Sequence, residues 1–256
     1  KKNDENVTDK NNINNQKILS KKNKKWIKKI IYDSDALCKA SQGGHSDLLE
    51  LILYQIAVEN IDVNDEDQES GATPLRFAIE GRHVECVKVL LKHPLINVNQ
   101  IHPLYGETPL MCICQAQDKI EKIQGLAIIK LLLNHPTINI DYIDNQPRIN
   151  PDDEDGDKAP SYDNALMNAA NYDFNEAIEL LLKSGARDSL FSSAARGDIE
   201  NMKRLLINVE DINDNNNING DGSTILHYAC ENGHLNVVKY LINTYKIDIN
   251  CANMDG

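Results

Sequence analysis

The chain of 256 residues has few features that would assign it to a chemical class. No apolar run is long enough to span a membrane, because charged residues interrupt each one. No Gly-rich phosphate loop, nucleophile elbow or His-Glu-x-x-His motif is present. These absences exclude a membrane-spanning helix of the usual kind and leave no sequence evidence for an enzyme. We therefore expect a non-catalytic protein without cofactor or metal.

Cysteine is also sparse. The six cysteines, at positions 38, 86, 112, 114, 230 and 251, form no disulfide framework. This pattern favours a reducing, intracellular and cytoplasmic setting. The chain begins with Lys1 and Lys2, without an initiator Met, and ends on Met254-Asp255-Gly256. We expect it to be a fragment of a longer protein, with another repeat opening at its end.

Charge is divided unevenly along the chain. Residues 1–30 hold ten lysines against three acidic residues, a balance of +7, whereas the remainder holds 17 basic and 36 acidic residues, a balance of −19. An acidic body of this kind repels nucleic acid and anionic membranes. We therefore expect no nucleic-acid partner for the body and a preference for basic protein segments.

The basic N-terminal part divides into two segments. Residues 1–23 are predicted to be a disordered, Lys- and Asn-rich tail. Residues 24–32 place Trp26, Ile27, Ile30 and Ile31 at helical spacing among lysines. We favour a capping helix that covers the first repeat. A membrane-surface or nucleic-acid contact is the alternative.

Six copies of one pattern follow. They begin at Asp35, Thr73, Thr108, Asn164, Asp188 and Thr224, all residue types that cap helix N-termini. Pro74 and Pro109 come next, where a missing backbone N–H costs nothing. A leucine follows each predicted cap by two residues: Leu37, Leu75, Leu110, Leu166, Leu190 and Leu226. Each copy therefore opens with a predicted helix.

A second helix is predicted in each copy from an aliphatic pair. The pairs are residues 52–53, 90–91, 132–133, 181–182, 205–206 and 241–242. Turn residues such as Gly197-Asp198 and Gly233-His234 separate the two helices. Small residues at the fifth and sixth places after the cap, such as Ala229 and Cys230, would let neighbouring helices approach closely.

The stretches "GATPLRFAIEGRHVECVKVLL" and "GSTILHYACENGHLNVVKYLI" carry this pattern most clearly. It resembles the ankyrin repeat, in which a loop precedes two antiparallel helices. The resemblance covers residues 33–256 as about six repeats, some degenerate. It implies an all-α solenoid of stacked helix-turn-helix units with short β-hairpin or loop fingers.

Two motifs suggest metal binding but are interpreted as structural. His227, Cys230 and His234 have zinc-like spacing, yet they provide no fourth ligand. Cys230 also falls at a small-residue position that we expect to be buried. The segment "DDEDGD" fails as a calcium loop, because Pro151 and Tyr162 stand where carboxylates are needed.

The repeat pattern is interrupted in three places. The third copy carries about seven extra residues around 116–125, which predict a lengthened helix pair. Residues 142–161 form an Asp- and Pro-rich insert, expected to be an acidic loop. The fourth and fifth copies are so close that we expect no finger between Gly185 and Leu190.

The resemblance implies that partners bind finger tips and the exposed turns of the first helices, which form a concave groove. Position by position, the predicted contacts are Glu80, Tyr105, Glu107, Gln115, Asp163, Asn171, Tyr172, Arg196, Asp221, Ser223, Glu231 and Asn232, with Ser70 and Ala72 beside them. Carboxylates are frequent in this set, and its two tyrosines are candidate anchors. The apolar tip of "QIHPLYGE" either contacts a partner or packs on its neighbour.

These residues predict a monomeric protein-binding scaffold that grips a basic segment of another protein. The plainer alternative is that the acidic residues only keep a solvated face soluble. A different alternative is that the array is a regulatory or targeting arm of a larger enzyme or membrane protein.

Overall fold

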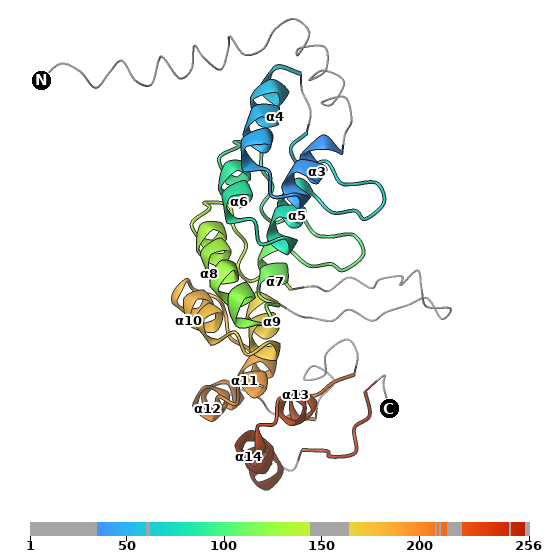
Figure 1. The fold of residues 1–256 in the computed structure, drawn as a ribbon. Coiled ribbons are helices and arrows are strands. Elements are labelled where there is room, and N and C mark those ends of the chain that lie inside the picture. The colour runs from blue at the N-terminus through green and yellow to red at the C-terminus, as the bar shows by residue number, and fades with distance from the viewer. Residues whose placement is uncertain are drawn as a thin grey trace, which may run out of the picture.

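The computed structural model describes residues 35–59, 62–143, 164–207, 209, 211–213, 222–245 and 247–253. The predicted tail, the capping helix and residues 144–161 of the acidic insert lie outside this part of the chain. Twelve helices lie within it, and no β-strand is assigned there. The helices form six consecutive pairs stacked into an elongated array (Figure 1). The predicted all-α solenoid is confirmed.

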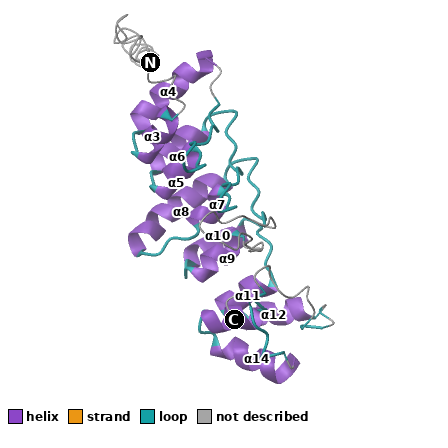
Figure 2. Cartoon of the chain, turned by 90° about the vertical axis from the view of Figure 1, so that its right-hand side faces the viewer, coloured by secondary structure: helices purple, strands orange, loops and turns teal. Residues whose placement is uncertain are grey.

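The pairs form two layers. The first helices make the inner layer: α3 (Ala36–Gln42), α5 (Pro74–Glu80), α7 (Pro109–Ile113), α9 (Ala165–Asn171), α11 (Leu190–Arg196) and α13 (Ile225–Glu231). The second helices make the outer layer: α4 (Ser46–Glu59), α6 (Val84–Leu91), α8 (Lys119–Leu133), α10 (Asn175–Lys183), α12 (Ile199–Leu206) and α14 (Leu235–Tyr245). Each inner helix packs on the next, so the inner layer is continuous from α3 to α13. In the outer layer, successive helices pack on one another from α4 to α10, and α12 packs on α14 (Figures 1 and 2).

Helix caps explain why the inner helices begin where they do. Thr73, Thr108 and Asn164 each accept a hydrogen bond from the backbone N–H three residues later, at 3.1, 3.3 and 2.9 Å. Asp35 precedes α3 but makes no such bond, and its carboxylate pairs with Lys39 at 3.3 Å instead.

The last inner helix is capped through a histidine. The backbone N–H of Thr224 donates to Nδ1 of His227 at 3.0 Å, and His234 Nε2 donates to the carbonyl of Ala195 at 2.7 Å. Both histidines that resembled zinc ligands therefore bond to the backbone. Within the described residues, no group of three or more His, Cys, Asp or Glu side chains is gathered to hold a metal.

The predicted phase of the fifth copy was wrong by one residue. Ser189, and not Asp188, caps α11, with its Oγ accepting from the Ser192 N–H at 3.1 Å. The second helix shifts in the same direction, because Leu206 is buried (2% exposed) whereas Leu205 is only partly buried. Asp188 is unavailable as a cap because its carboxylate binds Arg196.

Cys230 was also placed wrongly. Its counterparts Cys114 and Ala170 are buried beneath the following helix pair, but Cys230 is exposed. In the described chain, α13 and α14 are the last pair of the stack, so no further helix covers this position.

The irregular copies take simple forms. Helix α8 has 15 residues and α6 has 8, so the seven extra residues of the third copy lengthen its second helix alone. Helix α10 ends at Lys183 and α11 begins at Leu190. This short connection agrees with the expected missing finger.

The phase of the fifth copy can be tested with two neighbouring leucines. Leu206→Ala is expected to lower the free energy of unfolding by about 2–5 kcal/mol, the usual cost of truncating a core leucine. Leu205→Ala should cost about 1 kcal/mol or less, because this side chain is partly exposed. Urea unfolding followed by circular dichroism measures both. A larger loss of stability for Leu205→Ala than for Leu206→Ala would contradict the shifted phase and support the phase predicted from the sequence.

Candidate partner-binding face

The finger loops project from the inner-helix side of the stack, and two of them share one geometry (Figure 1). In the first finger, residues 62–73, the N–H of Asp67 donates to the carbonyl of Ala72 at 2.9 Å. In the second, residues 92–108, the N–H of His102 donates to the carbonyl of Glu107 at 3.0 Å. Each finger is therefore a tight hairpin loop without an assigned strand.

Side-chain oxygens join each finger to the next repeat. Four side chains each accept a hydrogen bond from a backbone N–H of the following repeat, at 2.7–2.8 Å. The acceptor and donor residues are Asn64 with Asn97, Asn99 with Asn139, Asp141 with Arg187, and Asn213 with Asp248. Where the finger is missing, Asp141 makes the bond to the shortened connection and also pairs with Arg187 at 3.5 Å. These hydrogen bonds therefore add to the packing of buried finger residues such as Val63 and Val98 in aligning the fingers.

Four of the predicted contact residues meet around Arg76. Its Nε donates to Glu80 at 2.6 Å, and its Nη2 donates to Glu107 at 3.0 Å. Gln115 donates to the other oxygen of Glu107, and the Tyr105 ring centroid lies 5.8 Å from the guanidinium carbon. The Arg76 side chain is only 8% exposed, so its charge is neutralised within the protein.

His102 holds the tip of the second finger beside this cluster. Its Nδ1 accepts from the N–H groups of Leu104 and Tyr105 at 3.2 and 3.4 Å, which requires an unprotonated Nδ1. Burial, and next the positive charge of Arg76, lower the pKa of His102 and so favour that neutral form. The His102 and Tyr105 rings also stack, with centroids 4.6 Å apart.

A second charged cluster surrounds Arg196. Its guanidinium donates to Asp188 at 3.0 and 2.5 Å and to Asp198 at 3.4 Å. Asn201 donates to Asp188 at 2.6 Å. The Arg196 side chain is 8% exposed, so this cluster ties α11 to α12 and leaves little of the cation for a partner.

The remaining predicted contacts are spread over the repeats. The most exposed of them are Tyr105 (60% exposed), Glu80 (41%), Asn171 and Glu231. Those that are partly buried are Glu107 (16% exposed), Gln115, Tyr172, Asn232 and Ser70, and those that are buried are Ser223 and Ala72. The structure does not describe Asp163 and Asp221. The tip of the second finger both packs on its neighbour and leaves apolar side chains exposed for a contact. Pro103 packs against Gly71 of the first finger, and Ile101 and Leu104 stay exposed.

The first finger creates the strongest negative charge in the described part of this face. Its twelve residues include five carboxylates and no Lys or Arg. Burial raises the pKa of Asp65, and the negative charge of Asp62 raises it further. The pKa of the nearby Cys38 thiol is raised to about 12, first by burial and then by the charges of Asp67 and its neighbours. The pKa of Asp67 is lowered, mainly by hydrogen bonds from Ser70 and slightly by the positive charge of Lys39. The shifts therefore indicate carboxylates that lie close to one another in one loop.

Sequence reasoning missed Arg76 and His102 as organising residues, and it placed Ser70 and Ala72 among the contacts without recognising the negative charge of the finger that holds them. Arg76 holds the place that His227 holds in the last repeat, three residues after the cap, so the pattern marked the position but not its ion pairs. The run "DVNDEDQES" was the available signal for the first finger.

Comparison with known proteins agrees with this architecture. A family model described as ankyrin repeats matches residues 10–102, 37–144 and 190–255, more than half of the chain. The chain belongs to the ankyrin repeat family. Residues 145–189 lie outside these matches, yet α9 and α10 form a repeat-like pair there.

Similar proteins share only short stretches with this ankyrin chain. A Caenorhabditis elegans protein named as a glutaminase is 35% identical over 60 residues, which are 23% of this chain and 9% of that protein. Ankyrin repeat domain-containing protein 40 of mouse and of human are each 37% identical over 65 residues, 25% of this chain and 17% of theirs. The chain therefore aligns with well under two thirds of each relative.

Ankyrin repeats generally mediate protein–protein interaction and are typically non-catalytic. No helix in the described part of the chain combines the length and apolarity needed to cross a bilayer.

The Arg196 cluster of the ankyrin array predicts a dependence of stability on pH. Burial alone would raise the pKa of Asp188, but hydrogen bonds from Arg196 and Ser192 outweigh burial and lower it. The resulting stabilisation is complete above the ordinary Asp pKa of about 3.9 and is lost as pH falls through the lower, folded-state pKa.

Asp188→Asn is therefore expected to lower the unfolding midpoint at neutral pH and to flatten its fall between about pH 4 and about pH 2. Thermal unfolding across that range measures the effect. Glu179→Gln, an exposed change on α10, is the control and should follow the wild type. Parallel acid curves for Asp188→Asn and wild type would contradict the assignment.

Proposed function

We propose that this ankyrin array is a non-catalytic scaffold that binds a basic segment of another protein along its acidic inner face. The observation that carries the proposal is the first finger, where Asp62, Asp65, Glu66 and Glu69 are exposed without a neighbouring cation in the loop. Uncompensated carboxylates on one rigid loop attract a cationic partner and speed its association.

The neighbouring second finger supports the same proposal. Tyr105 is exposed and lies against Arg76, which also pairs with Glu80, whose carboxylate is still 41% exposed. An amphipathic tyrosine beside acidic groups suits a segment that combines Lys or Arg with an apolar residue. Glu231 extends the acidic character to the last repeat. Arg76 and Arg196 keep their carboxylate partners in the bound state, and the scaffold acts as a monomer inside the cell.

The first finger gives a direct test. The triple variant Asp65→Asn/Glu66→Gln/Glu69→Gln removes three charges while it keeps similar shapes. A fluorescein-labelled Arg- and Leu-containing peptide is titrated with wild type and variant, and fluorescence anisotropy gives the Kd. We expect the variant to bind about tenfold or more weakly and wild-type binding to weaken as salt rises.

The matched control is Glu176→Gln/Glu179→Gln/Glu200→Gln, which removes three exposed carboxylates from the outer helices α10 and α12. It should change the Kd by about twofold or less. Equal weakening by the two triple variants would show that only net charge matters, and the acidic-face proposal would fail.

A second candidate function is a regulatory or targeting arm of a larger enzyme or membrane protein. The similarity to a protein named as a glutaminase favours this candidate. The stretch that resembles the present chain makes up only 9% of that protein, so a similar sequence there is a small part of a much longer chain. This candidate predicts that the native protein is much larger than the 28.7 kDa of the present chain. An immunoblot of native extract with an antibody raised against residues 164–253 measures this mass. A native band near 28.7 kDa would eliminate the candidate.

A further inference from the structure

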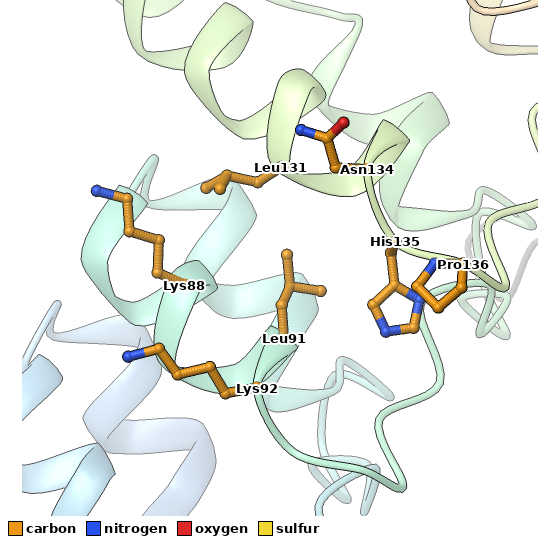
Figure 3. Close-up of a pocket in the computed structure, with 7 residues that line it drawn as sticks. All are labelled: Lys88, Leu91, Lys92, Leu131, Asn134, His135 and Pro136. Atoms are coloured by element: carbon orange, nitrogen blue, oxygen red, sulfur yellow. The ribbon is translucent and has the colours of Figure 1, made fainter.

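A pocket of about 390 Å³ lies between the outer-layer helices α6 and α8, at the ends where each helix passes into the loop that follows it. It is lined by Lys88, Leu91, Lys92, Leu131, Asn134, His135 and Pro136 (Figure 3). Lys88 and Leu91 lie in the C-terminal half of α6 and Lys92 is its C-cap, whereas the other residues come from the end of α8 and the turn after it. The pocket is therefore built by two successive repeats.

The lining combines an apolar floor with a basic rim. Leu91 and Leu131 face each other across the gap between α6 and α8, and the two lysines extend from α6 at its edge (Figure 3). No carboxylate lines the pocket, although the chain holds 39 acidic residues. An apolar floor with cationic groups at one edge is complementary to an apolar side chain flanked by carboxylates.

The lysines are accessible to such a partner. Lys88 pairs with Glu85 at 2.6 Å, but the two side chains are 44% and 68% exposed, so water already competes for this pair. Lys92 is exposed. Both lysines lie near the C-terminus of α6, where they also offset the negative end of the helix dipole. His135 Nδ1 faces Thr137 at 3.1 Å, which turns the other edge of the ring away from that contact.

We infer that this pocket is a second docking site, which takes an acidic segment of a partner protein with a leucine-like side chain seated between Leu91 and Leu131. Its opening toward solvent between two helices suits one protruding side chain better than an enclosed small molecule. The partner carboxylates replace Glu85 at Lys88 and pair with Lys92. This site is independent of the acidic inner face, which attracts the opposite charge.

The test uses the whole chain and a fluorescein-labelled short peptide of Glu and Leu, with the leucines three or four residues apart. Fluorescence anisotropy gives the Kd for wild type and for Lys88→Glu/Lys92→Glu. We expect the double variant to bind about tenfold or more weakly, because it turns the rim from basic to acidic. The same peptide with Ser in place of Leu should lose a similar factor.

The control variant is Lys203→Glu/Arg204→Glu on α12. Lys203 pairs with Glu200 at 2.6 Å three residues away, as Lys88 does with Glu85, so the two variants match in charge and setting. It should alter the Kd by about twofold or less. Equal losses in the two variants, equal binding of the Ser peptide, or no saturable binding by wild type would each overturn the inference.

Discussion

The rest of the structure depends on a hydrogen bond that links each repeat to the next, from a backbone N–H to a side-chain oxygen. Asn64, Asn99 and Asn213 accept this bond at full-length fingers, and Asp141 accepts it where the finger is missing. A finger is a largely polar loop that packing anchors only through a few buried residues, such as Val63 and Val98, and the hydrogen bond adds a directional link to that packing. Because the acceptor lies on one repeat and the donor on the next, the bond fixes their relative placement and aligns the loop tips.

Two arginines with buried side chains pair with carboxylates of the inner face and so reduce the negative charge that this face presents to solvent. Arg76 joins Glu80 of its own helix to Glu107 of the next finger, and Arg196 joins the start of α11 to the start of α12. Burying a cation is costly unless carboxylates pair with it, so these carboxylates serve the fold first. The first finger has no such arginine in its loop. Among the described residues, the first finger therefore keeps several exposed carboxylates that no arginine of its own loop pairs with.

The sequence predicted those parts of the fold that local chemistry determines. Thr73, Thr108 and Asn164 were predicted as caps because each carries an oxygen just before an apolar pattern, and no other residue competed. The fifth copy offered both Asp188 and Ser189, and the choice depends on Arg196, eight residues further on.

Accessibility could not be predicted in the same way. Glu107 has the sequence setting of an exposed finger residue, but Arg76, 31 residues earlier, draws it inward. Cys230 has the setting of a buried residue, but burial there needs a following helix pair. The outer pocket is equally non-local, because Lys88 and Leu131 belong to different repeats. The proposed acidic face and the proposed basic-rimmed pocket belong to different helix layers. Solvent-exposed charges that lie farther apart than the screening length of about 8 Å at physiological salt interact only weakly, so the two charges need not cancel.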